Sequence, residues 1–266
     1  MRHKLWIVLS FTALLGAAGV LLEGAAATGA QRLTEEPTAH RARRPGLSMR
    51  AVEATPTHEV EAVRTVPMSG DLPIVVAAGQ SDLPIVYLHG FCGDPARAKE
   101  WAASAQAHGT LIALHGNAPC VGKPGRYRFT ADMKYLDYRV RKAVGAAAAA
   151  TGRSLDAERI VLVGYSEGAT RAEQLAWVYP ERYPLLAVMS GPSAPSYDRL
   201  QRAERVAIVR GAKEYTKPYR RAAGHLTRAG LSTRYFELPE AAHGDFGDDA
   251  PRVMSELFRF LFSDLD

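Results

Sequence analysis

Short apolar segments recur along the chain from about residue 58 onward, and most of them end at a glycine. Most are continuous aliphatic runs, without an alternation of apolar and polar positions, which is typical of strands buried on both faces of a sheet. The pattern predicts strands at residues 59–68, 72–79, 83–90, 110–116, 159–164, 185–191, 205–211 and 232–239.

Longer helix-like stretches separate these segments. They lie at residues 95–109, 132–152, 167–183, 217–230 and 251–262. Strands that alternate with helices of this length predict an α/β fold, in which a mostly parallel sheet is covered by helices on both faces. Ligands of such sheets bind beyond the carboxyl ends of the strands, so we expect the chemistry in the loops that follow them.

The first 30 residues resemble a secretory signal peptide. Arg2 and Lys4 precede an apolar stretch from Leu5 to Val20, and small residues up to Ala30 provide a cleavage site. We therefore predict that residues 1–30 direct export, to the periplasm or the outside of the cell. The alternative is an uncleaved N-terminal membrane anchor, because the apolar stretch is close to the minimum length for spanning.

Residues 31–57 are rich in Arg, Thr, Pro and Ala and show no apolar periodicity, which predicts a flexible linker ahead of one domain at 58–266. Of the formal net charge of +5, +1 falls in residues 1–30 and +2 in the linker. The domain therefore carries little net charge, and nucleic-acid binding finds no support. The basic cluster from His40 to Pro45 is expected to be solvated, with a transient membrane or cell-envelope contact as the alternative.

The strongest chemical signal is the segment GYSEG, which places Ser166 between Gly164 and Gly168. This G-x-S-x-G pattern arises by chance in roughly one chain in ten of this length at average glycine and serine contents. Here it follows a predicted strand and opens a predicted helix, which is the setting of a nucleophile elbow. Ser166 is therefore predicted to be a nucleophile.

A serine nucleophile needs a base, and an acid that orients the base. Around such an elbow the chain order is serine, acid, histidine, which leaves His225 and His243 as candidate bases. His225 falls inside a predicted helix, whereas His243 follows the last strand and is the predicted base. Glu214, in the loop after the strand at 205–211, is the predicted acid, with Asp198 as the runner-up.

Backbone amides are expected to stabilise the oxyanion that forms during the reaction. One is the amide of Glu167, which follows the nucleophile. The other is the amide of Phe91, in the H-G-x-x-G loop after the strand at 83–90. His89, at the start of this loop, is expected to hold the loop in place instead of taking part in the chemistry.

The segments LHGFCG, GYSEGA, VRGAKEYTKP and AAHGDFG follow the order found in α/β-hydrolases, and the chain from about residue 60 to 266 resembles that superfamily. The elbow region is most similar to small carboxylesterases and lysophospholipases and to feruloyl or polyester esterases. The resemblance implies a three-layer α/β sandwich and hydrolysis of carboxylic esters, with Ser166 attacking, His243 moving the proton and Glu214 orienting it. It implies no cofactor, and no His/Cys pair has the spacing of a metal site.

The resemblance also carries expectations about the cleft. The interval between residues 190 and 205 is too short for a cap domain, so the cleft is expected to be open to a small-molecule or polymer-linked ester. Its apolar walls are expected to include Tyr165, Tyr127 and Phe129, and less strongly Tyr197.

In this superfamily the strands at 83–90 and 110–116 are neighbours. Cys92 and Cys120 lie in the loops that follow them, so the two are expected to form a disulfide in an exported protein.

Two other functions share this pattern. A serine peptidase or amidase uses the same three residues, and sequence motifs do not separate it from an esterase. A non-catalytic binding module on the same fold is the third candidate, against which the presence of serine, glutamate and histidine argues.

Overall fold

A computed structural model describes residues 62–263 of this chain. The predicted signal peptide at 1–30 and the predicted linker at 31–57 lie outside the described residues, as does the predicted start of the domain at residue 58. Between residues 62 and 263, no helix is both long enough and apolar enough to cross a bilayer.

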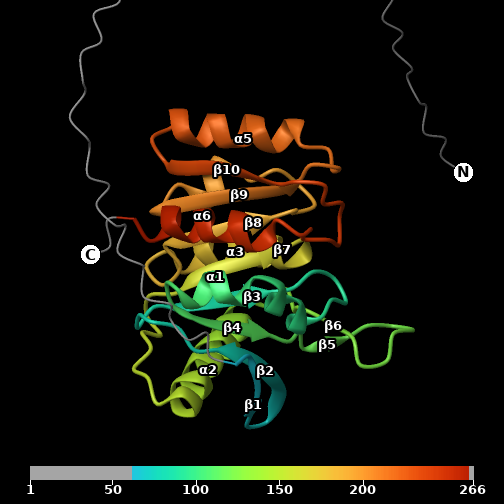
Figure 1. The fold of residues 1–266 in the computed structure, drawn as a ribbon, viewed down its shortest axis with the longest axis vertical. Coiled ribbons are helices and arrows are strands. Elements are labelled where there is room, and N and C mark those ends of the chain that lie inside the picture. The colour runs from blue at the N-terminus through green and yellow to red at the C-terminus, as the bar shows by residue number, and fades with distance from the viewer. Residues whose placement is uncertain (1–61, 264–266) are drawn as a thin grey trace, which may run out of the picture. The chain divides into compact units, whose positions relative to one another are not determined.

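An eight-stranded sheet forms the centre of the described domain, with the order β1-β2-β4-β3-β7-β8-β9-β10 (Figure 1). Strands β1 and β2 pair antiparallel, and the pairs from β4 to β10 are parallel, which confirms the mostly parallel sheet. The strands are β1 (Arg64–Met68), β2 (Asp71–Ala77), β3 (Pro84–Leu88), β4 (Thr110–Leu114), β7 (Val161–Tyr165), β8 (Leu185–Met189), β9 (Arg205–Gly211) and β10 (Ser232–Leu238).

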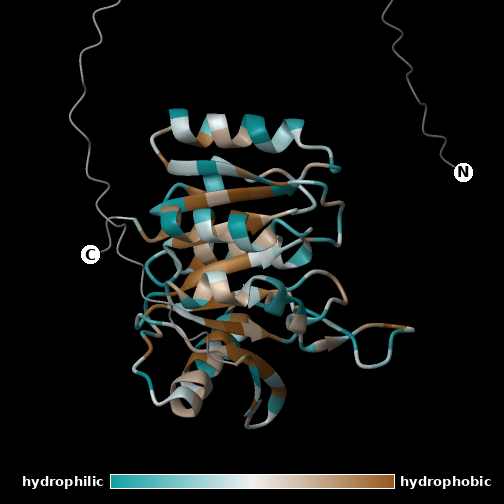
Figure 2. Ribbon diagram, viewed as in Figure 1, coloured by the Kyte–Doolittle hydropathy of each residue, from teal (hydrophilic) through white to brown (hydrophobic). Residues whose placement is uncertain are grey.

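Helices cover both faces of the sheet, as the alternation predicts. One face packs against α2 (Met133–Thr151), α3 (Glu167–Val178), α4 (Tyr197–Leu200) and α5 (Lys217–Arg228). The other face packs against the 3-10 helix η1 (Pro95–Trp101), α1 (Ala102–Gln106) and α6 (Ala250–Leu261). Figure 2 shows the inner strands of the sheet as hydrophobic along most of their length, and α5 as largely hydrophilic. Burial on both faces is the reason that β3, β4, β7 and β8 consist wholly of buried residues.

The connections differ in three details from the sequence-based expectation. The helix expected at 167–183 ends at Val178, because Tyr179 precedes a proline and leaves the helical conformation. The long loop after β4 contains a two-stranded hairpin, β5 (Ala118–Pro119) and β6 (Tyr127–Arg128). The interval between β8 and β9 holds the short helix α4, which was not expected; the interval leaves no room for a cap domain, as the sequence predicts.

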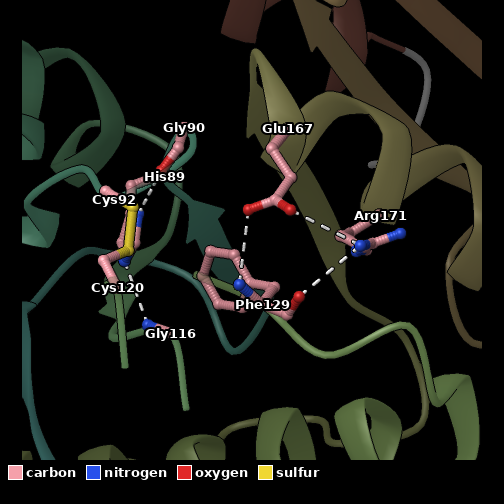
Figure 3. The surroundings of a disulfide bond; sticks show 8 residues. All are labelled: His89, Gly90, Cys92, Gly116, Cys120, Phe129, Glu167 and Arg171. Atoms are coloured by element: carbon pink, nitrogen blue, oxygen red, sulfur yellow. Dashed lines mark hydrogen bonds and ion pairs between the residues drawn. A yellow bond between two sulfur atoms is a disulfide. The ribbon is translucent and has the colours of Figure 1, made fainter. Parts of the chain in front are cut away.

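The disulfide expected between Cys92 and Cys120 is present, with the two Cα atoms 5.9 Å apart (Figure 3). Parallel pairing of β3 with β4 places the loops that follow these strands side by side. The bridge spans 28 residues and ties the loop at 89–95, which we call the oxyanion loop, to the β5–β6 hairpin.

Two glycines allow β7, α3 and β3 to meet without side chains between their backbones. A Cβ atom at Gly168 would lie 1.9 Å from the carbonyl oxygen of Leu88, at the end of β3. A Cβ atom at Gly164 would lie 2.3 Å from the carbonyl oxygen of Gly168. Both separations are far below contact distance, so any other residue forces these elements apart.

We expect the Cys92→Ser, Cys120→Ser double variant to lose about 3–4 kcal/mol of unfolding free energy, because the open chain regains the entropy of a loop of this length. Urea unfolding of the oxidised wild type and the variant measures the difference. Equal stability of the two proteins would contradict a native bridge.

Gly168→Ala is expected to lower the unfolding free energy by about 3 kcal/mol, the upper end of the usual cost of overpacking. Gly145→Ala is the matched control, because Gly145 is exposed in α2 and a Cβ atom there meets nothing within 4 Å. That change should stabilise the protein by about 0.5–1 kcal/mol. Thermal unfolding of both variants tests the difference, and a neutral Gly168→Ala would show that the backbones are not in close contact.

Candidate active site

Ser166 occupies a strained turn between β7 and α3. It has φ of 54° and ψ of −115°, a conformation that a non-glycine residue adopts at a cost of about 1–3 kcal/mol. Its amide donates a 2.9 Å hydrogen bond to the carbonyl of Met189, at the end of the neighbouring strand. The turn therefore presents the Ser166 hydroxyl at the carboxyl edge of the sheet, in front of the positive end of the α3 dipole.

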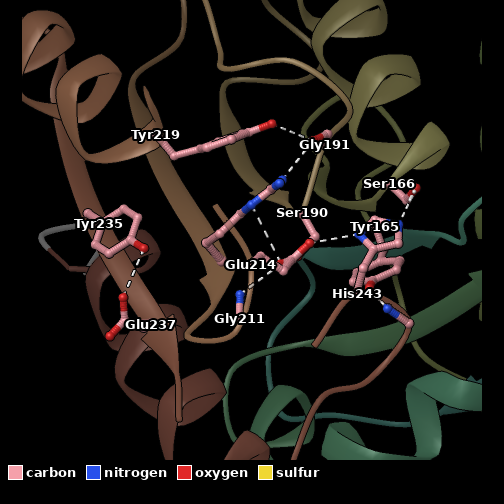
Figure 4. Close-up of polar contacts among 12 residues, drawn as sticks. Tyr165, Ser166, Ser190, Gly191, Gly211, Glu214, Tyr219, Tyr235, Glu237 and His243 are labelled. Carbon is pink, nitrogen blue, oxygen red and sulfur yellow. Dashed lines mark hydrogen bonds and ion pairs between the residues drawn. The ribbon is translucent and has the colours of Figure 1, made fainter. Parts of the chain in front are cut away.

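Three side chains from three separate loops form a continuous hydrogen-bonded series (Figure 4). The Oγ atom of Ser166 lies 3.1 Å from Nε2 of His243, and Nδ1 of His243 lies 2.7 Å from Oε1 of Glu214. A carboxylate can only accept a hydrogen bond, so the proton of the neutral imidazole lies on Nδ1. Nε2 is then free to accept the proton of the serine hydroxyl.

Of the two acids predicted for this site, the structure brings Glu214 to His243. Its side chain is 5% exposed, and its second oxygen, Oε2, accepts hydrogen bonds from Ser190 Oγ at 2.5 Å and from the Gly211 amide at 2.9 Å. Asp198 lies instead on the exposed side of α4, and no contact joins it to His243 within residues 62–263. Glu214, and not Asp198, is therefore the predicted acid that contacts His243.

The surroundings of Glu214 favour its ionised form. Burial by itself raises the pKa of this carboxyl, but hydrogen bonds from Ser190, Gly211 and His243 and the charge of Arg210 outweigh that effect. The pKa of Glu214 therefore lies below its ordinary value. The residue is a carboxylate at neutral pH and can stabilise a positively charged His243.

Sequence reasoning did not identify Ser190. It is 2% exposed, has a positive φ of 45°, and follows β8 directly. Its amide donates to the carbonyl of Val209 at 2.9 Å, which places the hydroxyl toward the Glu214 carboxylate. A small polar residue directly after a buried strand was the available signal, but its partner is 24 residues away and is apparent only in the fold.

The oxyanion loop is held from inside the protein by His89. Nε2 of His89 accepts a 3.0 Å hydrogen bond from the Gly116 amide, and Nδ1 lies 2.7 Å from the carbonyl of Gly90. Burial lowers the pKa of His89 to about 4, so the ring is neutral at pH 7. These contacts match the expectation that His89 holds the loop.

The amides of Phe91 and Glu167 have no hydrogen-bond partner among the described residues. The Glu167 carboxylate turns away from the reaction side, toward the Phe129 amide at 3.4 Å and Arg171 at 3.5 Å (Figure 3). This side chain thereby links the turn at Ser166 to the segment that follows β6. The Phe91 side chain is 60% exposed at the mouth of the cleft.

A cleft of about 250 Å³ opens beside Ser166, between the oxyanion loop and the loop that carries His243. Its lining includes the predicted Tyr165 together with residues that the sequence reasoning did not identify. The lining residues are Tyr87, His89, Gly90, Phe91, Gly93, Asp94, Arg97, Tyr165, Ser166, His243, Gly244 and Phe246.

The expectation that Tyr127 and Phe129 line this cleft is corrected, since neither is among the lining residues. Phe129 is 1% exposed and packs beneath His89, with ring centroids 4.7 Å apart. Tyr127 belongs to β6 and meets the edge of His115. Tyr197, the weaker candidate, packs against the core from α4. The segment that follows β6 turns the Phe129 ring inward, which its sequence does not reveal.

No group of three or more His, Cys, Asp or Glu side chains within residues 62–263 is arranged to hold a metal ion.

No protein-family model matches this chain, and no curated protein matches it either. Solved structures do match. The carboxylesterase of Bacillus cereus is 15% identical over 70% of this chain and 93% of its own, with a TM-score of 0.50. The fluorophosphonate-binding serine hydrolase F of Staphylococcus aureus is 12% identical over 75% and 98%, with a TM-score of 0.52. The S-formylglutathione hydrolase of Agrobacterium tumefaciens is 12% identical over 75% and 94%, also with a TM-score of 0.52.

Similarity at this level of identity concerns the fold. The neighbours share the mostly parallel sheet and its covering helices over nearly their whole length. The described domain of this chain has the α/β-hydrolase fold.

Proposed function

We propose that this protein is a serine hydrolase that cleaves carboxylic esters through an acyl-enzyme. The observation that carries the proposal is the series from Ser166 to His243 to Glu214, with its distances of 3.1 and 2.7 Å, at the edge of an accessible cleft. The names of the structural neighbours, a carboxylesterase, a serine hydrolase and an S-formylglutathione hydrolase, support the same class of reaction.

In the first half of the proposed reaction, Ser166 Oγ attacks the ester carbonyl carbon while Nε2 of His243 takes its proton. The carbonyl oxygen becomes an oxyanion, for which the amides of Phe91 and Glu167 are the proposed donors. His243 then gives the proton to the leaving alcohol, and the acyl group remains on Ser166. Glu214 stabilises the imidazolium throughout this exchange.

In the second half, a water molecule replaces the alcohol. His243 takes a proton from the water, whose oxygen attacks the acyl carbon. The oxyanion forms again in the same place, and its collapse releases the carboxylic acid while His243 returns the proton to Ser166. No cofactor enters this sequence of steps.

Export of the protein is also part of the proposal. The N-terminal signal-like segment supports it, and a disulfide between Cys92 and Cys120 is typical of oxidising compartments outside the cytoplasm. Without a cap domain between β8 and β9, we infer that an ester attached to a larger molecule or polymer can reach Ser166. The N-terminal segment would provide any contact with a membrane or the cell envelope.

The deciding experiment uses a fluorophosphonate probe and short-chain p-nitrophenyl esters with the purified protein. We expect the wild type to be labelled and to hydrolyse the esters, and Ser166→Ala to lose labelling and at least roughly 10⁴-fold in kcat. Absence of both labelling and hydrolysis in the folded wild type would refute an enzyme and favour a binding module. Faster cleavage of a matched p-nitroanilide than of the ester would favour an amidase.

Glu214→Gln is expected to lower kcat by roughly 10³- to 10⁴-fold, because a neutral amide neither stabilises the imidazolium nor maintains the required tautomer. Asp198→Asn is the matched control and should stay within about twofold of the wild type, since an exposed carboxylate without a partner among residues 62–263 contributes little. Steady-state kinetics on one ester compares the two. A large loss in Asp198→Asn alone would reassign the acid.

The stability of the wild type and of Glu214→Gln provides a second test. The folded pKa of Glu214 lies below its unfolded value of about 4.3, so its carboxylate stabilises the fold above that pH and ceases to do so as the pH falls through the folded pKa. The difference in unfolding free energy between the wild type and Glu214→Gln should therefore become smaller as the pH falls from 7 to 3. Urea unfolding of both proteins at several pH values measures it.

A further inference from the structure

Tyr87 forms part of the inner wall of the cleft, although it is 2% exposed. It lies in β3, and its ring meets Trp101 of η1 edge-on, with ring centroids 5.4 Å apart. The ring is therefore anchored in the core that η1, α1 and α6 cover. Burial raises the pKa of its phenol, so the hydroxyl keeps its proton at neutral pH.

The Tyr87 hydroxyl has no hydrogen-bond partner among the described residues. The other polar side chains that line the cleft are all engaged: Ser166 with His243, His89 with Gly116, Asp94 with Ala96, Arg97 with Glu100, and Tyr165 with Gly244. The Tyr87 oxygen is not among the fully buried unpaired atoms of the described residues, so it borders the cleft, where a bound ligand can pair with it. Tyr87 therefore supplies the unused polar group of the cleft.

The rest of the cleft is suited to a flat apolar group. Rings of Phe91, Tyr165 and Phe246 line it together with that of Tyr87. The Arg97 guanidinium lies 5.1 Å from the centre of the Phe246 ring and also bonds the Gly244 carbonyl at 2.5 Å, which fixes that wall. The volume of about 250 Å³ is below the roughly 300–1,000 Å³ of sites for larger ligands, so a single ring fits it better than a long chain.

Resting on the proposed function, we propose that the preferred substrate is an ester carrying one aromatic ring with a hydroxyl substituent, and that the Tyr87 hydroxyl selects it by a hydrogen bond. The ring packs among the aromatic walls, and the substituent satisfies the phenol that the protein leaves unpaired. The ring belongs either to the acid or to the alcohol of the ester, and the substrates below distinguish the two.

The test uses two matched series. For the acid side, methyl phenylacetate is compared with its 2-, 3- and 4-hydroxy derivatives; for the alcohol side, benzyl acetate is compared with the same three derivatives. We expect the wild type to prefer at least one hydroxylated isomer in one series by at least about fivefold in kcat/KM, the effect of one neutral hydrogen bond.

Tyr87→Phe should reduce that preference to less than about twofold, since only the hydroxyl is removed. Tyr138→Phe, at a half-exposed position on α2, is the matched control and should keep the wild-type preference. The quantity to compare is the ratio of kcat/KM for a hydroxylated ester to that for its unsubstituted partner. Comparing this ratio between the wild type and Tyr87→Phe cancels the effect of the substituent on the ester's own reactivity. A preference that persists in Tyr87→Phe, or the absence of one in the wild type, would overturn the inference.

Stability provides a second readout. Removing a hydroxyl that borders the cleft and has no partner among the described residues should leave the melting temperature of Tyr87→Phe close to that of the wild type. A clear decrease would mean that the hydroxyl has a partner inside the protein, which would also overturn the inference.

A binding measurement separates this inference from the proposed function. In the Ser166→Ala background, calorimetry should show tighter binding of the preferred hydroxylated ester than of its unsubstituted partner, and the added Tyr87→Phe change should abolish the difference. If the wild type hydrolyses esters but this binding difference is absent, only the role of Tyr87 is refuted. If the binding difference is present but the wild type shows neither hydrolysis nor probe labelling, the proposed enzymatic function is refuted and the proposed class of ligand is retained.

Discussion

The close contact of β7, α3 and β3 at Gly164 and Gly168 is the constraint on which the site depends. With no side chain between these backbones, the chain turns sharply enough to hold Ser166 at a φ of 54°. The same contact sets the end of β3 directly against the elbow, so the oxyanion loop that follows β3 starts beside the nucleophile. One packing arrangement thus positions both the attacking oxygen and the amides proposed to receive the negative charge.

The groups around this turn are held by connections that run along the carboxyl edge of the sheet. Ser190 and Gly211, at the ends of β8 and β9, hold one oxygen of Glu214 and leave the other for His243. His89 and the disulfide hold the oxyanion loop from the side of β4. The groups proposed to react therefore lie on loops, but each loop is fixed at a strand end, which is how a rigid scaffold achieves preorganisation.

The site also concentrates features that lower the stability of the fold. Ser166 and Ser190 both have positive φ angles without being glycines. The apolar core on both faces of the sheet supplies the stability that tolerates this strain. Backbone strain at Ser166 and at Ser190, which holds Glu214, fits a site built for function instead of for stability.

The sequence by itself determined the order of strands and helices, because continuous apolar runs and glycine stops are local signals. It also determined Ser166, His243 and Glu214 as candidates, because the fold restricts their order and their position after strands. Only the tertiary structure placed Glu214, and not Asp198, beside His243 and revealed the contact of Ser190 with Glu214. It also placed Tyr87, Arg97 and Phe246 in the cleft, in place of Tyr127 and Phe129. Those contacts join segments far apart in the chain, and the direction of a side chain in a loop or hairpin leaves no periodic trace in the sequence.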